Sequence, residues 1–292
     1  MINSNTKGII YLQLCLIFFL IGDILLKILF DSVPIGQLIW FRTIASIACL
    51  FFFITSTGRI HLLRTRNPGQ HALRGIFFAV ISMGYYLAVK NFPLSAVAAA
   101  LAGAPILIFV ISPFILKEKA NVAQWIATLT GFMGVCLVLR LKISDFSLLY
   151  LSLLSLPFAY AILILWGRRL SKTDSDWAIN FYQFIPLLII SSFSGLDQWI
   201  YVSKIQFINL MISGAAGAIG FMFLITAFRL AKPIIVAPFE YTYILMALTV
   251  DIIFWNLMPD NFIWTGVTLI LICGIIQWRQ STLDEAEKIR DS

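Results

Sequence analysis

The sequence predicts an all-α integral membrane protein, with ten transmembrane helices in two inverted five-helix repeats. Three observations predict this fold class: an apolar composition, apolar runs long enough to cross a bilayer, and similar ends to the two halves. Of the 292 residues, 60% are hydrophobic and only 12% are charged. A soluble domain of this length could not bury so much apolar surface, so a polytopic membrane protein is expected.

The apolar runs have the length that a spanning helix needs. About 20 apolar residues cover a hydrocarbon core of ~30 Å, because each helical residue rises ~1.5 Å. Backbone groups in lipid must bond within helices or closed barrels, and these runs are continuous rather than alternating, which excludes a barrel. Pro, Gly, Asn and charged residues bound ten expected helices, over residues 8–29, 35–56, 73–92, 94–115, 122–140, 146–168, 177–194, 207–230, 233–255 and 261–279.

The distribution of Lys and Arg predicts the orientation of the helices. If the N-terminus is cytoplasmic, 15 of these residues lie in inner segments and 4 in outer segments. We therefore expect a multi-pass protein of the cytoplasmic (inner) membrane with both termini cytoplasmic, ending in a polar tail over residues 281–292. The net charge of +7 is spread over several short loops, so it reflects topology and does not indicate a nucleic-acid partner.

The two halves of the chain close with similar segments. Residues 125–140 read WIATLTGFMGVCLVLR, and residues 264–279 read WTGVTLILICGIIQWR. Five spans per half would reverse the second half in the membrane, an arrangement in which transporters place substrates near the midplane between repeats. Residues 1–142 and 143–280 are therefore expected to form the two repeats.

The chain resembles the EamA-type family of the drug/metabolite transporter superfamily from Gly8 to Arg279. The residues and motifs that carry the resemblance are Pro105, Glu118-Lys119 and GFMG in the first half, and APFEYT, MPDN and WTGVTLILICGI in the second. Before the last Pro-Asp, where relatives often carry a Glu, this chain has Asn256-Leu257. The resemblance implies a secondary transporter that moves a small metabolite by alternating access. Cationic, aromatic or cofactor-like substrates such as S-adenosylmethionine or riboflavin are the candidates.

Other function classes stay open at this point. A lipid flippase or a non-transporting membrane scaffold is the alternative function. An enzyme is not expected, because the helices contain no supported Ser/His, Asp/Asp or His-metal set. No GxxxxGK[ST] motif is present, so any ATP would have to be used by a partner chain. No cofactor and no metal are therefore predicted. The expected partners are a small-molecule substrate, a coupling proton and the lipid bilayer, with the chain as a monomer or homodimer.

Five ionisable residues fall inside the expected helices, where a charge costs at least ~2.5–3.5 kcal/mol at the bilayer centre. They are Asp23, Lys27, Arg42, Glu240 and Asp251. Asp23 and Lys27 are four residues apart on one helix face, and Arg42 lies at a similar depth on the returning helix. We expect Asp23 to pair with Lys27 or Arg42, either as a structural ion pair or as an external gate that contacts substrate. Asp251 is expected to be solvated near an outer end.

Glu240 stands in the apolar stretch VAPFEYTYIL, ~10 Å inside the cytoplasmic end of its helix. Pro238 removes one backbone donor and frees a carbonyl nearby. A carboxylate beside Tyr241 and Tyr243 predicts a polar site that faces a central cavity. There Glu240 would contact a cationic or hydrogen-bonding substrate, or carry a coupling proton.

Further tyrosines near mid-depth could stack on a flat or cationic substrate, although packing is an equally ordinary use of such rings. They are Tyr85, Tyr86 and Tyr160. Small residues at every third position of 207–230, namely Gly214, Gly217 and Gly220, predict close helix packing.

Overall fold

The computed structural model describes residues 4–104, 107, 122–139, 148–231 and 233–290. Every regular element within these ranges is a helix. The α-helices are α1 (Ser4–Leu29), α2 (Ile35–Ser56), α3 (Pro68–Asn91), α4 (Leu94–Leu101), α6 (Val122–Leu139), α7 (Leu148–Leu170), α8 (Asp176–Ser192), α9 (Lys204–Leu230), α10 (Pro233–Val236), α11 (Thr242–Trp255) and α12 (Asn261–Arg290). Short 3-10 helices are η1 (Ile60–Leu63), η3 (Leu196–Gln198) and η4 (Ala237–Tyr241).

Five helices of the described ranges are long and apolar enough to cross a membrane: α1, α2, α3, α9 and residues Leu149–Leu170 of α7. Shorter apolar helices cover Leu129–Leu139 and Asn261–Ile276. The expected helix 94–115 lies partly outside the described residues, within which α4 ends at Leu101. The expected polar tail continues α12 as a helix to Arg290.

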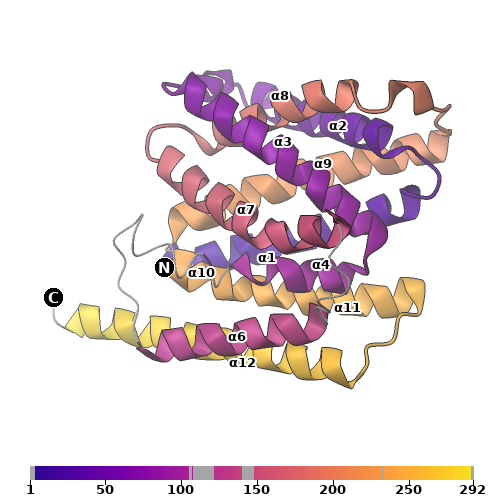
Figure 1. Cartoon of the computed structure of the whole chain (residues 1–292). Helices are drawn as coiled ribbons and strands as arrows, with labels where there is room; N and C mark the ends of the chain where they lie inside the picture. The colour runs from indigo at the N-terminus through magenta and orange to yellow at the C-terminus, as the bar shows by residue number, and fades with distance from the viewer. Residues whose placement is uncertain (1–3, 105–106, 108–121, 140–147, 232, 291–292) are drawn as a thin grey trace.

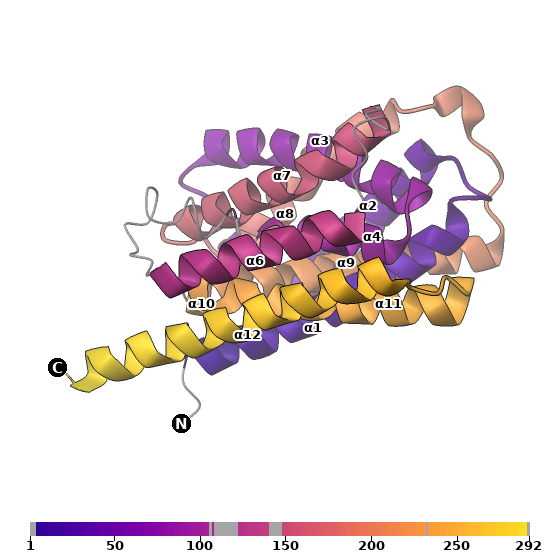
Figure 2. The ribbon, with the colours of Figure 1, turned by 60° about the horizontal axis from the view of Figure 1, so that its bottom comes forward.

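The helices form one bundle in which each half of the chain packs against the other (Figures 1 and 2). The most extensive contacts join α1 to α9 and α6 to α12. In addition, α2 packs on α8 and α9, α3 on α7 and α8, and α4 on α11. Both termini lie at the same end of the bundle, which we call the terminal end (Figure 1).

Glycines allow the closest of these helix crossings. A Cβ at Gly214 of α9 would collide with the Arg42 carbonyl of α2, and a Cβ at Gly220 would lie 2.6 Å from the Phe19 ring of α1. Gly134 of α6 and Gly266 of α12 face one another, because a Cβ on either would lie 2.6 Å from the carbonyl oxygen of the other. The predicted small-residue packing of α9 is thus confirmed for contacts with α1 and α2.

The expected helix 233–255 is broken rather than continuous. A single turn of α10 leads into η4 and then α11. Pro238 stands in η4, where its missing N–H cannot support a regular α-helical ladder. The break turns the Glu240 segment inward between α1 and α12, which both contact η4.

Asp251 differs from the sequence expectation, because it is buried and only 1% exposed. Its two carboxylate oxygens accept hydrogen bonds from the backbone N–H groups of Leu94 (3.1 Å) and Ser95 (2.8 Å). These groups belong to the first turn of α4, which has no intrahelical partners for them. Asp251 of α11 therefore caps α4 from another helix, an arrangement that the helix dipole also favours.

A second buried acid ties the loops at the terminal end. Asp174, between α7 and α8, accepts hydrogen bonds from the backbone N–H of Arg66 (3.1 Å) and the side-chain amide of Asn67 (2.8 Å). Desolvation opposes ionisation of this carboxyl, but hydrogen bonds from Thr65, Asn67 and neighbouring groups outweigh it and hold the pKa of Asp174 well below its usual range. The loop before α3 is thereby fixed to the loop before α8.

Candidate functional site

A cavity of ≈ 110 Å³ lies between α1, α2, α3, α4, α7, α8, α9 and the η4–α11 segment. We call it the central cavity. At ~10–15 Å³ per water position, it holds several water molecules. Its walls are mainly apolar and include eight aromatic rings, which come from Phe19, Phe78, Tyr85, Tyr86, Tyr160, Phe184, Phe221 and Tyr243.

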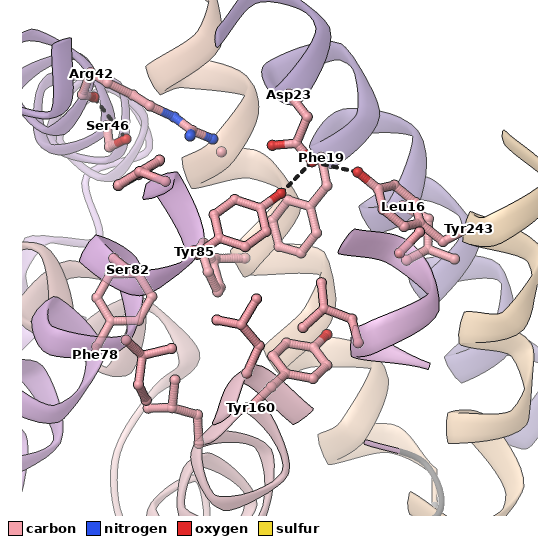
Figure 3. A pocket seen from close by; sticks show the side chains of 18 of the residues that line it. Leu16, Phe19, Asp23, Arg42, Ser46, Phe78, Ser82, Tyr85, Tyr160 and Tyr243 are labelled. Atoms are coloured by element: carbon pink, nitrogen blue, oxygen red, sulfur yellow. Dashed lines mark hydrogen bonds between the residues drawn. The ribbon is translucent and has the colours of Figure 1, made fainter. Parts of the chain in front are cut away.

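Asp23 of α1 is the acceptor for two phenols in this cavity (Figure 3). Its Oδ2 atom accepts hydrogen bonds from the hydroxyls of Tyr85 on α3, at 2.5 Å, and of Tyr243 on α11. The side chain is almost fully buried, at 2% exposure. One carboxylate thus links three helices from both halves of the chain.

Arg42 of α2 enters the cavity through a slot made by two glycines. A Cβ at Gly22 of α1 or at Gly217 of α9 would lie 3.1 Å from its Nη2 atom. The guanidinium carbon lies 5.3 Å from the ring centroid of Tyr86, within the range of a cation–π contact. The Nη1 atom is buried and has no hydrogen-bond partner.

The direct ion pair expected for Asp23 is not formed. Among the ion pairs of the described residues, none within 4.0 Å joins Asp23 to Arg42 or Lys27. Two phenols occupy the near oxygen of Asp23, while Arg42 extends toward the carboxylate from α2 (Figure 3). Charge attraction between Asp23 and Arg42 remains, but it acts over a longer distance than a contact pair.

Lys27 lies one turn after Asp23 on α1, and its contacts are at the end of the bundle away from the terminal end. Its Nζ atom donates to the carbonyl oxygen of Phe92 at 2.7 Å and lies 5.1 Å from the ring centroid of Trp255. The carbonyl belongs to the C-terminal cap of α3, which lacks intrahelical donors. Lys27 therefore joins three helix ends away from the central cavity.

Glu240 lines the central cavity from the η4 turn. It is 7% exposed, and its Oε1 atom is buried without a hydrogen-bond partner. The hydroxyl of Tyr160 on α7 interacts with the Glu240 carboxyl group. An unpaired buried carboxylate oxygen costs free energy, so Oε1 is a candidate contact for a cation or a hydrogen-bond donor of the substrate.

A polar side chain of α1 holds the Glu240 segment in place. Gln13 donates from Nε2 to the carbonyl oxygen of Phe239 at 3.2 Å, and its Oε1 accepts from the hydroxyl of Thr242 at 2.9 Å. These bonds satisfy backbone and side-chain groups on either side of Glu240. The carboxyl is therefore positioned by its neighbours while its own Oε1 stays unpaired.

Tyr241 does not share the cavity with Glu240, although the two are adjacent in sequence. Its side chain is buried at 2% exposure, and its hydroxyl lies 3.7 Å from the Cys273 sulfur of α12. Successive residues of a 3-10 turn project about 120° apart, so one faces the cavity and the next faces α12. The structure thus brings together Asp23, Arg42, Tyr85, Tyr86, Tyr160, Glu240 and Tyr243.

Sequence reasoning missed the phenylalanine walls and the hydroxyls of Thr43, Ser46 and Ser82 that line the cavity. Phe is the most frequent aromatic residue here, with 25 copies, so no spacing separates a wall ring from ordinary packing. In the described residues, no group of three His, Cys, Asp or Glu side chains could hold a metal ion.

Comparison with known proteins gives a consistent result. The model of the EamA-like transporter family matches residues 6–140. An S-adenosylmethionine uptake transporter of Rickettsia prowazekii (strain Madrid E) is 26% identical over 274 residues, which is 92% of each chain. A riboflavin transporter of Vibrio cholerae serotype O1 is 26% identical over 239 residues, 80% of each chain.

A solved crystal structure shares the fold with a TM-score of 0.72, covering 93% of this chain and 96% of that chain at 14% identity. The named relatives above are transporters of small metabolites. Together with the apolar helices, these matches indicate a multi-pass membrane protein that is similar to transporters of small metabolites. Residues 6–140 thus match the EamA-like transporter family, and the matches to the named relatives extend that likeness along the chain.

Proposed function

We propose that this transporter moves a flat, positively charged metabolite of the S-adenosylmethionine class across the cytoplasmic membrane by alternating access. The observation that carries the proposal is the Oε1 atom of Glu240, buried and unpaired on the wall of an aromatic cavity. A carboxylate in that position lacks a cation, and a sulfonium or ammonium group would supply one. Leaving the carboxylate unpaired costs roughly 1–3 kcal/mol or more.

The aromatic walls suit the rest of such a substrate. An adenine ring is flat and stacks on aromatic side chains, and a cation is attracted to their faces. Arg42 is already opposed by Asp23 across the cavity, so its unpaired Nη1 suits a neutral acceptor such as a ribose hydroxyl. The relatives named for S-adenosylmethionine uptake match along 92% of this chain, which supports the same substrate class.

The volume of the cavity supports a closed or occluded state. A space of ≈ 110 Å³ holds waters but is small for a whole nucleoside, so substrate entry requires the helices around it to separate. Opening toward one side at a time is alternating access, and in such transporters the site lies at the interface of repeats. The hydrogen bonds from Tyr85 and Tyr243 to Asp23 join helices of both halves, and these bonds would break during that opening.

The helix contacts support two inverted repeats, 1–142 and 143–280. The first helix of each half packs on the third of the other, as α1 on α9 and α7 on α3. The second helix of each half also packs on the third of the other, as α2 on α9 and α8 on α3, and like packs on like in α2 on α8, α4 on α11 and α6 on α12. A two-fold axis in the membrane plane would produce this pattern, and both termini at one end fit ten spans (Figure 1).

A substrate panel in proteoliposomes tests the proposal. Labelled S-adenosylmethionine is the probe, and unlabelled S-adenosylhomocysteine and riboflavin are competitors. S-adenosylhomocysteine keeps the adenosine and amino-acid groups but its sulfur is neutral, so we expect at least tenfold weaker competition than from unlabelled S-adenosylmethionine. Stronger competition by riboflavin would overturn the cationic substrate class. Absence of any uptake would favour the alternatives, a lipid flippase or a scaffold.

A further inference from the structure

A second buried cation lies beyond the central cavity, toward the terminal end. Arg74 of α3 is only 5% exposed. Among the ion pairs of the described residues, none brings a carboxylate within 4.0 Å of its guanidinium. A buried cation without a counter-charge is costly to desolvate, so Arg74 is a candidate contact for an anionic group of a ligand.

Arg74 is held in place by neutral groups. Its Nη1 atom donates to Oε1 of Gln183 at 3.0 Å, Gln183 donates to Oδ1 of Asn180 at 2.8 Å, and Asn180 donates to the carbonyl oxygen of Ala218 at 2.9 Å. The amides are therefore oriented so that an acceptor faces the guanidinium. The Nε atom remains buried with no partner.

The guanidinium borders a small cavity of ≈ 20 Å³, which we call the inner cavity. Tyr160, Leu163 and Phe221 line both this space and the central cavity, so they separate the two. Gly167 keeps the inner cavity open beside Arg74, since a Cβ there would lie 3.3 Å from Nη2. At ~10–15 Å³ per water position, the inner cavity admits one small group rather than a whole substrate.

We propose that Arg74 binds the carboxylate of an α-amino-acid group at one end of the transported molecule. Tyr160 borders both cavities and interacts with Glu240, so the acid lines one and the arginine lines the other of two cavities that share this ring. A substrate whose sulfonium meets Glu240 would direct its amino-acid end past Tyr160, so that the carboxylate meets Arg74. The planar guanidinium suits a carboxylate, with which it forms charge-assisted hydrogen bonds. This assignment rests on the proposed function and adds to it the recognition of the amino-acid end.

The test compares S-adenosylmethionine with decarboxylated S-adenosylmethionine, which lacks only the carboxylate. Equilibrium binding of both is measured on the full chain in lipid nanodiscs, for wild type, Arg74→Gln and Arg74→Lys. A hydrogen bond to a charged group corresponds to about 10- to 100-fold in affinity. We expect wild type to prefer S-adenosylmethionine by at least tenfold, Arg74→Gln to lose that preference, and Arg74→Lys to retain part of it. Affinity for the decarboxylated compound should stay unchanged in Arg74→Gln.

Gly167→Ala provides a second variant that keeps the arginine, in case Arg74→Gln does not fold. Its methyl group would occupy space beside the guanidinium, so the preference for the carboxylated ligand should fall without loss of binding to the other. An equal loss for both ligands in the folded variants would overturn the assignment, since that is what a structural role predicts. Wild type that binds S-adenosylmethionine with no preference would also overturn it. Wild type that binds neither compound would instead reject the proposed function, and this assignment with it.

Discussion

Substitution of Asp23 by Asn tests whether this carboxylate holds the bundle together. The change keeps the size of the side chain but removes the charge that two phenols and Arg42 face. A hydrogen bond to a charged acceptor contributes ~1.5–3 kcal/mol and a neutral one ~0.5–1.5 kcal/mol. Two such bonds predict that Asp23→Asn lowers the free energy of unfolding by about 2–3 kcal/mol, and the loss of charge opposite Arg42 adds to this.

The assay is equilibrium unfolding in mixed detergent micelles, with Asp31→Asn as the matched control. Asp31 is an exposed acid in the turn after α1, so its neutralisation should change stability by less than ~0.5 kcal/mol. Tyr85→Phe and Tyr243→Phe should each destabilise less than Asp23→Asn, and the pair should be non-additive because both hydroxyls use one oxygen. Unchanged stability of Asp23→Asn would refute a structural role, and lost transport in that folded variant would make Asp23 a gate.

Three further predictions concern topology, packing and pH. Reporter fusions at residue 65 and at the C-terminus should read cytoplasmic and a fusion at residue 200 external; an external C-terminus would contradict the ten-helix topology. Gly217→Ala should displace Arg42 from its slot, because the new Cβ would lie 3.1 Å from Nη2, and should reduce uptake at least several-fold at similar expression. The pKa of Asp174 is lowered in the folded state, so its contribution to stability is present above an unfolded pKa of ~3.9 and is lost as pH falls through the folded value. Unfolding rates measured from pH 6 downward should therefore depend less on pH in Asp174→Asn than in wild type.

Controls make the last two results decisive. Gly69→Ala is the matched control for Gly217→Ala, because nothing lies within 4 Å of a Cβ at Gly69, and it should transport normally. Equal effects of the two glycine variants would show that the Arg42 slot is not needed. An Asp174→Asn variant with the wild-type pH profile would show that this carboxyl does not link folding to pH.

Helix positions could be predicted from the sequence because long apolar runs follow directly from the thickness of a bilayer. The breaks could be located only in part. Pro238 indicated a disturbed helix, but the division into α10, η4 and α11 depends on packing against α1 and α12. The extension of α3 back to Pro68 was also missed, because its first turn is polar.

The contacts of buried charged side chains were harder to predict than the places of those residues within the helices. Sequence spacing suggested cations for Asp23, yet its hydrogen bonds come from tyrosines 62 and 220 residues away. Asp251 was expected in solvent, although it caps a helix 156 residues earlier in the chain. A binding role for Arg74 was not predicted, because basic residues near the start of a helix normally mark membrane topology. Such partners depend on which helices become neighbours, and a single sequence does not specify that.

The central claim is that Glu240 contacts the positive part of the substrate. The most direct measurement is equilibrium binding of S-adenosylmethionine to Glu240→Gln at equal pH, with no gradient across the membrane. Tyr241→Phe is the matched control, because its ring faces α12 rather than the cavity. We predict at least tenfold weaker binding by Glu240→Gln and unchanged binding by Tyr241→Phe. Wild-type binding by Glu240→Gln, with loss only of uptake driven by a pH gradient, would contradict the claim and assign Glu240 to proton coupling.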